Sequence, residues 1–163
     1  MSKIAVYPGS FDPITMGHID IINRVSQIFD KVIVLVANSS EKRYLFSSEE
    51  RANFVRRSLS VKNVEVHVYN GLTTDFMKEQ KAQVIIRGLR AVADFEYEGT
   101  LANMNYRLAP EIETFMIFSR PEYYYISSKG VKEMARNGGA LKGLIPEFLE
   151  PILLEKLYST KNN

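Results

Sequence analysis

Short apolar runs alternate with longer amphipathic segments along this chain of 163 residues. The short runs are rich in β-branched residues, and two of them, Lys31–Val36 and Val84–Ile86, are apolar almost throughout. Such runs are typical of parallel strands that helices cover on both faces. Five runs predict strands, at Lys3–Tyr7, Lys31–Val36, Val64–Tyr69, Val84–Ile86 and Glu113–Phe118.

The spacing of apolar residues between these runs predicts helices. After the first strand, one helix face is formed at intervals of three and four by Ile21, Ile22, Val25, Ile28 and Phe29. Farther along, Ser47 and Glu50 have the spacing of a capping box and predict the start of a second helix. The inward face of that helix would carry Ala52, Val55 and Leu59. Alternating strands and helices predict a doubly wound, Rossmann-like α/β fold, a parallel sheet with helices on both faces.

Composition limits both the organisation and the classes of function. No repeat or linker interrupts the chain, so we expect a single domain over residues 1–158 and a polar tail at residues 159–163. The net charge of +2 is too small to imply a nucleic-acid partner, so none is expected, and no apolar run approaches the roughly 20 residues of a membrane span. A Pro-Gly pair comes too early for a secretory signal, so a cytoplasmic location is expected. The absence of Cys from the sequence excludes disulfides, thiolate nucleophiles and Cys-based zinc sites.

The segment P-G-S-F-D-P-I-T-M-G-H follows the first strand, and we interpret it as a phosphate-binding turn. In a doubly wound fold, ligands bind at the carboxyl ends of the strands. Thr15 is the expected N-cap of the next helix, so His18 falls in its first turn, beside backbone N–H groups that favour an anion. The alternative is a plain turn formed by Gly9, Pro13 and Gly17, with His18 on the surface.

Arg87 and Arg90 flank a Gly-Leu pair just after the fourth predicted strand. Arginine binds phosphates through a fixed charge and bidentate donors, so this pair predicts a clamp for two phosphates. Two solvated surface arginines are the alternative. Downstream, Asp94, Glu98 and Asn105 form a polar stripe beside an apolar one, a pattern normal for any exposed helix.

Two segments carry recognisable signatures. T-M-G-H resembles the (H/T)-x-G-H signature of class I nucleotidyltransferases, and I-S-S-K-G-V-K resembles the second signature of that superfamily. Between them, I-R-G-L-R-A-V-A-D-F-E-Y-E, together with the first segment, resembles the phosphopantetheine adenylyltransferases rather than their nicotinamide or cytidylyl relatives. The resemblance runs from Ile4 to Leu157, nearly the whole chain.

The resemblance implies an enzyme that joins AMP from ATP to 4′-phosphopantetheine in coenzyme A synthesis, giving dephospho-coenzyme A and pyrophosphate. The expected reaction is a direct in-line attack without a covalent enzyme intermediate. Mg²⁺ would be carried mainly by the ATP phosphates, since the sequence offers no carboxylate cage for a metal site of its own. A homohexamer is also implied.

The resemblance also implies roles for individual residues. The catalytic residues would be His18, Lys42 and Arg90. The acceptor substrate would be bound by Ser10, Lys42, Thr73 and Arg87. ATP would be bound by Gly9, Ser10, Phe11, His18, Gly88, Leu89, Arg90, Glu98, Tyr123, Tyr124, Tyr125, Ile126, Ser127, Ser128 and Lys129.

Several of these residues have a second interpretation. Lys42, taken alone, is a solvated loop lysine. Tyr123, Tyr124 and Tyr125 could form an aromatic run at a strand edge, and we favour that packing role for Tyr124 and Tyr125. His67 alternates with valines, is expected on the polar face of a strand, and is given no catalytic role.

Two positions depart from the family pattern. Met16 replaces the commoner Asn, at a position whose side chain need not touch phosphate. Lys129 replaces the third Ser after I-S-S, which removes one hydroxyl contact to ATP. The replacement places a cation in the first turn of a predicted helix capped by Ser127 or Ser128, where the helix dipole disfavours it. Such a cation either binds the β- and γ-phosphates of ATP or extends into water.

Two other functions stay open from the sequence. One is adenylyl or cytidylyl transfer to a different acceptor with the same phosphate-binding residues. The other is a nucleotide-sensing module that keeps the ATP pocket without turnover.

Overall fold

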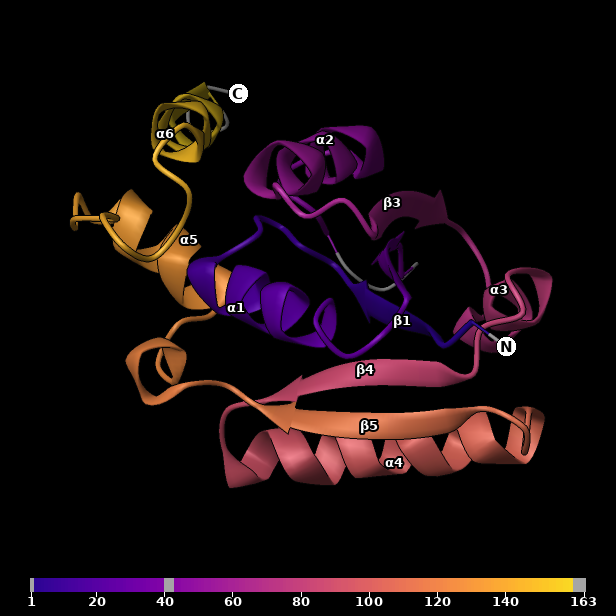
Figure 1. The fold of residues 1–163 in the computed structure, drawn as a ribbon. Coiled ribbons are helices and arrows are strands. Elements are labelled where there is room, and N and C mark those ends of the chain that lie inside the picture. Colours follow the sequence, from indigo (N-terminus) through magenta and orange to yellow (C-terminus); the bar gives the residue numbers. More distant parts are fainter. Residues whose placement is uncertain (1, 40–42, 160–163) are drawn as a thin grey trace.

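The computed structural model describes residues 2–39 and 43–159 of the chain, built around a five-stranded sheet. The strands are all parallel and lie in the order β3-β2-β1-β4-β5 (Figure 1). Their bounds are β1 Ile4–Gly9, β2 Lys31–Ala37, β3 Val64–Tyr69, β4 Val84–Leu89 and β5 Glu113–Phe118. All five predicted strands are confirmed.

Helices cover both faces of this sheet. They are α1 Met16–Val25, α2 Ser48–Ser58, α3 Thr73–Glu79, α4 Val92–Leu108, α5 Ser128–Arg136 and α6 Leu149–Ser159, with a short 3₁₀ turn at Pro121–Tyr123. One apolar cluster joins the sheet to α1, α2, α5 and α6, and a second joins the opposite face to α3. The α4 helix runs alongside β4 and β5 (Figure 1). The doubly wound fold is therefore confirmed.

Three strands extend past their predicted ends, β2 only by Ala37 and the other two farther. β1 continues to Gly9, and β4 continues through Arg87 and Gly88 to Leu89. Both predicted phosphate-binding segments therefore begin inside the sheet. Since successive residues of a strand face opposite sides, Arg87 lies on the α4 side and Gly88 on the α1 side. A Cβ atom on Gly88 would lie 2.6 Å from Cδ1 of Ile21, so any larger residue here would displace the Ile21 side chain.

The predicted start of α2 is confirmed. The Ser47 hydroxyl accepts a hydrogen bond from the Glu50 backbone N–H at 3.2 Å, and the Glu50 carboxylate accepts one from the Ser47 N–H at 2.7 Å. Ala52 and Val55 are fully buried beneath this helix, and Leu59, its C-cap, is half-buried against the same core.

The predicted inward position of Ile28 is wrong. The α1 helix ends at Val25, and the N–H groups of Ile28 and Phe29 both donate to the carbonyl of Val25. This turn breaks the helical period, which leaves Ile28 68% exposed and returns Phe29 to the core.

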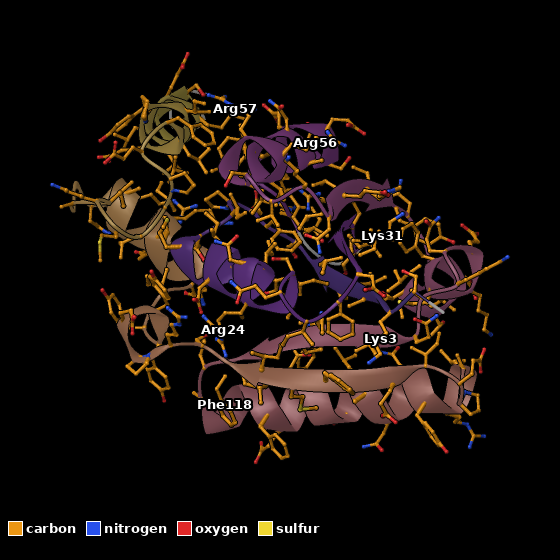
Figure 2. The ribbon with its side chains drawn as sticks, in the orientation of Figure 1. Lys3, Arg24, Lys31, Arg56, Arg57 and Phe118 are labelled. Carbon is orange, nitrogen blue, oxygen red and sulfur yellow. The ribbon has the colours of Figure 1, made fainter. Side chains whose placement is uncertain are left out.

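Polar contacts attach the end of β5, an edge strand, to α1. The Arg24 guanidinium donates to the carbonyl of Phe118 at 2.9 Å (Figure 2) and to the Asp20 carboxylate at 3.1 Å. Asp20 also pairs with Arg120 at 3.2 Å. These contacts fix the point at which the chain leaves the sheet toward α5.

The described ranges contain no helix that is long and apolar enough to cross a membrane. The α6 helix extends to Ser159, so the expected polar tail begins at the last residue of this helix. The rest of that tail, residues 160–163, lies outside the described ranges.

Candidate active site

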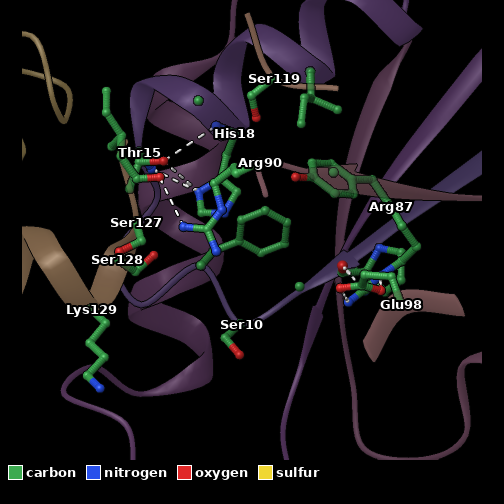
Figure 3. A pocket seen from close by; sticks show the side chains of 18 residues that line it. Ser10, Thr15, His18, Arg87, Arg90, Glu98, Ser119, Ser127, Ser128 and Lys129 are labelled. Carbon is green, nitrogen blue, oxygen red and sulfur yellow. Dashed lines mark hydrogen bonds and ion pairs between the residues drawn. The ribbon is translucent and has the colours of Figure 1, made fainter. Parts of the chain in front are cut away.

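A cavity of about 340 Å³ opens at the carboxyl ends of β1 and β4, between the N-termini of α1 and α5 (Figure 3). This is the place where doubly wound folds bind ligands. The residues that line it come from both predicted phosphate-binding segments, from α4 and from the start of α5.

His18 faces the cavity from the first turn of α1. Thr15 is the N-cap, as predicted, and the two residues form a capping box. The Thr15 backbone N–H donates to Nδ1 of His18 at 3.1 Å, while the Thr15 hydroxyl accepts from the His18 backbone N–H at 3.4 Å. Burial, together with the nearby Arg90 guanidinium, lowers the pKa of His18 to about 4. The ring is therefore neutral at physiological pH and carries its proton on Nε2.

The turn before α1 is shaped by a close approach between its own residues. Phe11 is buried and adopts a positive φ of 49°, an uncommon conformation for a residue other than glycine. Its ring packs edge-on against the His18 ring, with centroids 5.1 Å apart. A Cβ atom on Gly9 would lie 2.8 Å from the Phe11 ring, so the turn requires glycine at this position. The packed ring holds His18 in place, which excludes a loose surface histidine.

Arg87 is bound to Glu98 on one side of the cavity. Its Nε and Nη2 atoms donate to the two oxygens of the Glu98 carboxylate, at 2.5 and 2.7 Å. Its Nη1 atom donates to the carbonyl of Pro8 at 2.9 Å. Arg87 is therefore held by β1 and α4 together and is not a freely solvated side chain.

Arg90 lies on the other side of the cavity, near His18 (Figure 3). The Asp94 carboxylate accepts hydrogen bonds from the backbone N–H, Nε and Nη2 of Arg90, at 3.0, 3.1 and 3.2 Å. Nη1 donates to the carbonyl of Ile126 at 3.2 Å. Arg90 thus connects the end of β4 to the segment that begins α5.

The N-terminus of α5 forms a further wall of the cavity. Ser127 is its N-cap, and the Ser127 hydroxyl accepts a hydrogen bond from the Gly130 N–H at 3.0 Å. The Ser128 hydroxyl donates to the carbonyl of Pro13 at 2.7 Å, which joins α5 to the turn before α1. Lys129 lines the cavity and is exposed, so it lies at the rim. Two helix N-termini, each of which favours an anion, therefore face one cavity.

Comparison with known proteins assigns this site to a family. A cytidylyltransferase-like family model matches residues 6–134. The chain is 63% identical over 158 residues to a phosphopantetheine adenylyltransferase of Bdellovibrio bacteriovorus, covering 96% of this chain and 99% of that protein. The chain belongs to the phosphopantetheine adenylyltransferase family. Another member, from Desulforudis audaxviator, is 55% identical and covers 94% of this chain and 95% of its own length.

A solved structure supports the fold on independent grounds. It is assigned as a nicotinate-nucleotide adenylyltransferase of Vibrio parahaemolyticus, with a TM-score of 0.71 and 17% identity, covering 97% of this chain and 96% of that one. At this identity the likeness shows the shared fold alone.

Most of the residues that the phosphopantetheine adenylyltransferase pattern implies are gathered in the cavity. Those that line it are Gly9, Ser10, Phe11, His18, Arg87, Gly88, Arg90, Glu98, Ile126, Ser127, Ser128 and Lys129. The structure thus brings together segments separated by up to 120 positions in the sequence, from Gly9 to Lys129.

Among the residues that the structure describes, several of the family pattern do not line the cavity. Leu89 is buried in the sheet, and Thr73 begins α3 beyond the end of β3. Tyr123 ends the 3₁₀ turn and packs against the core around α1. Lys42 lies outside the described residues. His67 is also outside the cavity, on β3, with Nε2 3.1 Å from the Glu65 carboxylate.

The favoured packing role of Tyr124 and Tyr125 is wrong. These residues follow a 3₁₀ turn rather than lying at a strand edge, and they are 55% and 71% exposed. The adjacent Pro121 starts this turn, and proline is favoured at such a position because its φ is already fixed there.

Sequence reasoning missed two polar side chains that line the cavity, Tyr7 and Ser119. Tyr7 is 5% exposed, and its hydroxyl has no hydrogen-bond partner among the described residues. The sequence could have identified Tyr7 as a site residue, because it is the last side chain of the β1 apolar run before the phosphate-binding turn. It lies on the face that α1 covers. Burial raises the pKa of this phenol, which therefore remains a neutral hydrogen-bond donor.

Two buried charged side chains also hold the phosphate-binding turn in place. The Asp12 carboxylate accepts from the backbone N–H groups of Leu45 and Phe46, both at 3.0 Å, and from the Lys132 ammonium at 2.7 Å. Arg51, only 1% exposed, donates to the carbonyl of Ser10 at 2.6 Å. The turn is thereby joined to α2 and α5 without an additional ligand.

Proposed function

We propose that the chain transfers the adenylyl group of ATP to the phosphate of 4′-phosphopantetheine, releasing pyrophosphate and giving dephospho-coenzyme A for coenzyme A synthesis. Family membership supports this activity, together with one observation: His18, Arg90 and the N-terminus of α5 meet at a single cavity. All three donate hydrogen bonds to anions, and a triphosphate needs several such donors close together.

We place ATP along the N-termini of α1 and α5, and the acceptor phosphate beside Ser10 and Arg87. Arg87 and Arg90 lie on opposite sides of the cavity (Figure 3), which makes one guanidinium available to each substrate. Lys42 and Thr73 are added to the acceptor site on the family pattern alone.

In the proposed reaction, an oxygen of the acceptor phosphate attacks the α-phosphorus of ATP in line with the leaving group. A new P–O bond forms, the bond from the α-phosphorus to the oxygen that bridges to the β-phosphate breaks, and pyrophosphate leaves with the electron pair. The attacking group is already an anion, so neither a protein nucleophile nor a general base is required. Alignment of the two substrates contributes on the order of 7 to 11 kcal/mol.

His18 and Arg90 are proposed to stabilise the charge that develops on the transferring and leaving phosphates. The neutral His18 ring offers its Nε2–H as a fixed donor, because Nδ1 is already bonded to Thr15. Arg87, together with Lys42, is proposed to orient the attacking phosphate and to restrain its charge.

Mg²⁺ is proposed to enter the site on the ATP phosphates, where it would neutralise part of their charge. The described residues contain no group of three or more His, Cys, Asp or Glu side chains that could hold a metal ion. The Glu98 and Asp94 carboxylates are bonded to Arg87 and Arg90. These side chains do not form a metal site of their own, and no step is assigned to the ion. Activity that survives removal of Mg²⁺ with EDTA would contradict the proposal.

We propose that the chain assembles as a homohexamer, as the family resemblance implies. Large apolar side chains on α4 and β5 are 47% to 71% exposed, namely Phe95, Tyr97, Met104, Tyr106, Leu108, Phe115 and Phe118. Exposed apolar surface of this extent marks an interface between proteins. A monomer in light scattering would contradict the assembly.

A cytoplasmic location is proposed because ATP is available there, and cell fractionation tests it.

The decisive experiment is pyrophosphate release from ATP with 4′-phosphopantetheine as acceptor, with the nucleotide product identified by mass spectrometry. Pantetheine is the matched control, because it lacks the attacking phosphate and is expected not to react. Preference for another acceptor would identify a different transferase. ATP binding without pyrophosphate release for any acceptor would identify a nucleotide-sensing module.

A further inference from the structure

The Asp94 carboxylate fixes the position of the Arg90 side chain. One carboxylate oxygen accepts from the Arg90 backbone N–H at 3.0 Å and from Nε at 3.1 Å, and the other accepts from Nη2 at 3.2 Å. The same carboxylate therefore binds both the backbone N–H and the guanidinium of Arg90. Rotation of this long side chain is restricted before any ligand arrives.

The Arg90 guanidinium retains donors for a ligand in this arrangement. A guanidinium has five N–H bonds, of which Asp94 takes those of Nε and one of Nη2, and the carbonyl of Ile126 takes one of Nη1. One N–H remains on each of Nη1 and Nη2. The ion pair thus leaves two donors for phosphate oxygens, in a direction set by Asp94 and Ile126.

Arg87 is held in the same manner, which indicates that the arrangement is a feature of the site. Its Nε and Nη2 atoms bind Glu98, and its Nη1 atom donates to a backbone carbonyl, that of Pro8. Asp94 and Glu98 are four residues apart and therefore lie on one side of α4. Each arginine at the cavity is oriented by a carboxylate of this helix and by a carbonyl from another segment.

We propose that Asp94 is a positioning residue for adenylyl transfer, which holds the Arg90 guanidinium with its two remaining N–H groups toward the phosphates of the nucleotide. This inference rests on the proposed function for the reaction. The effect of Asp94 on ATP binding, however, can be measured without turnover. Without Asp94, the Arg90 side chain loses a bidentate, charge-assisted contact and its preferred orientation. The loss should fall on the steps that depend on Arg90.

The test compares Asp94→Ala and Arg90→Ala with the double variant. Asp94→Ala should lower kcat/KM for ATP about 10- to 100-fold, the loss corresponding to one charge-assisted contact. The loss caused by Asp94→Ala should be distributed between kcat and KM in the same proportion as the loss caused by Arg90→Ala. The double variant should be within about threefold of Arg90→Ala alone, because Asp94 acts through a side chain that is already absent. Asp94→Glu, which retains a carboxylate on a longer side chain, should recover part of the loss.

Glu96→Ala is the matched control, because Glu96 is an exposed carboxylate on the same turn of α4. It should leave the kinetics unchanged, and the thermal midpoint of each variant separates loss of folding from loss of function. Normal kinetics of Asp94→Ala would overturn the proposal. It would also be overturned if the loss of kcat/KM in the double variant equalled the product of the losses in the two single variants. If the wild-type chain releases no pyrophosphate, the proposed function fails, and calorimetry of ATP binding to the same variants still decides the role of Asp94.

Discussion

Nδ1 of His18 accepts a hydrogen bond from the backbone N–H of Thr15, 3.1 Å away, in the capping box that begins α1. Because Nδ1 is the acceptor, the proton of the neutral ring is on Nε2, the atom left to donate toward the cavity. One local motif therefore both starts the helix and selects the tautomer.

Replacement of His18 by Ala should lower kcat by on the order of 10², the effect of removing a donor that stabilises transition-state charge. The KM for ATP should change less, because the donor acts mainly in the transition state. Steady-state kinetics of pyrophosphate release measure both quantities. His67→Ala is the control, since it removes the other histidine of the chain and lies outside the cavity. A near-normal kcat for the His18 variant would remove His18 from the mechanism.

The pKa of His18 also predicts how stability depends on pH. In the folded chain this pKa is lowered by burial to about 4, below the ordinary value of 6.5, so the unfolded chain takes up the proton first as the pH falls. The contribution of the neutral His18 ring to the free energy of unfolding is complete above pH 6.5 and is lost as the pH falls toward 4. The free energy of unfolding changes by at most about 1.4 kcal/mol per pH unit over this range. Denaturant unfolding between pH 7 and 4 measures it. His18→Gln should show a shallower slope; an identical slope would contradict the lowered pKa.

The Arg87–Glu98 pair predicts that stability and substrate binding respond differently to substitution. Arg87→Ala should weaken the acceptor site by about 1.5 to 3 kcal/mol, the range for a charge-assisted contact. It should also destabilise the fold, because the largely buried Glu98 carboxylate loses its partner. Adding Glu98→Ala should recover stability without restoring the KM for phosphopantetheine. Recovery of both, measured by thermal unfolding and kinetics, would assign the pair a purely structural role.

Lys129→Ser restores the common family residue at the rim of the cavity. Lys129 is in the first turn of α5, where the helix dipole disfavours a cation, and it has no ion pair among the residues that the structure describes. If its ammonium contacts the β- and γ-phosphates, as we expect, the substitution should raise the KM for ATP several-fold. The effect should shrink at high salt, because screening weakens the original contact. Unchanged ATP kinetics at low ionic strength would show that the side chain is only solvated.

The elements of the fold were predictable because their local signals agree. β-branched runs marked the strands, and the caps at Thr15 and Ser47 marked two helix starts. Ile28 was misplaced because the residues after Val25 include no Gly or Pro to signal the end of α1. The turn there is set by hydrogen bonds to the Val25 carbonyl, which apolar spacing does not reveal.

The residues of the site were predictable by type, but their partners were not. Arg87 and Glu98 are eleven positions apart, on a strand and a helix, so their pairing depends on how α4 packs beside β4. The burial of Asp12 and Arg51 similarly depends on contacts with segments that are 34 and 41 positions away. Helical or strand periodicity describes neighbours within one element and contains no information about such contacts.

The strand order also determines when each pairing becomes possible as the chain leaves the ribosome. Residues 4–69 contain β1, β2 and β3, which are adjacent in the sheet and pair in direct succession. The other edge of β1 can pair only after β4 has been synthesised, because Ala5 pairs with Val84, almost eighty residues later. Throughout that interval the central strand of the finished sheet is an open edge, which is the kind of surface that pairs with other chains. The emerging chain is therefore most vulnerable to aggregation after β3 is made and before β4 arrives.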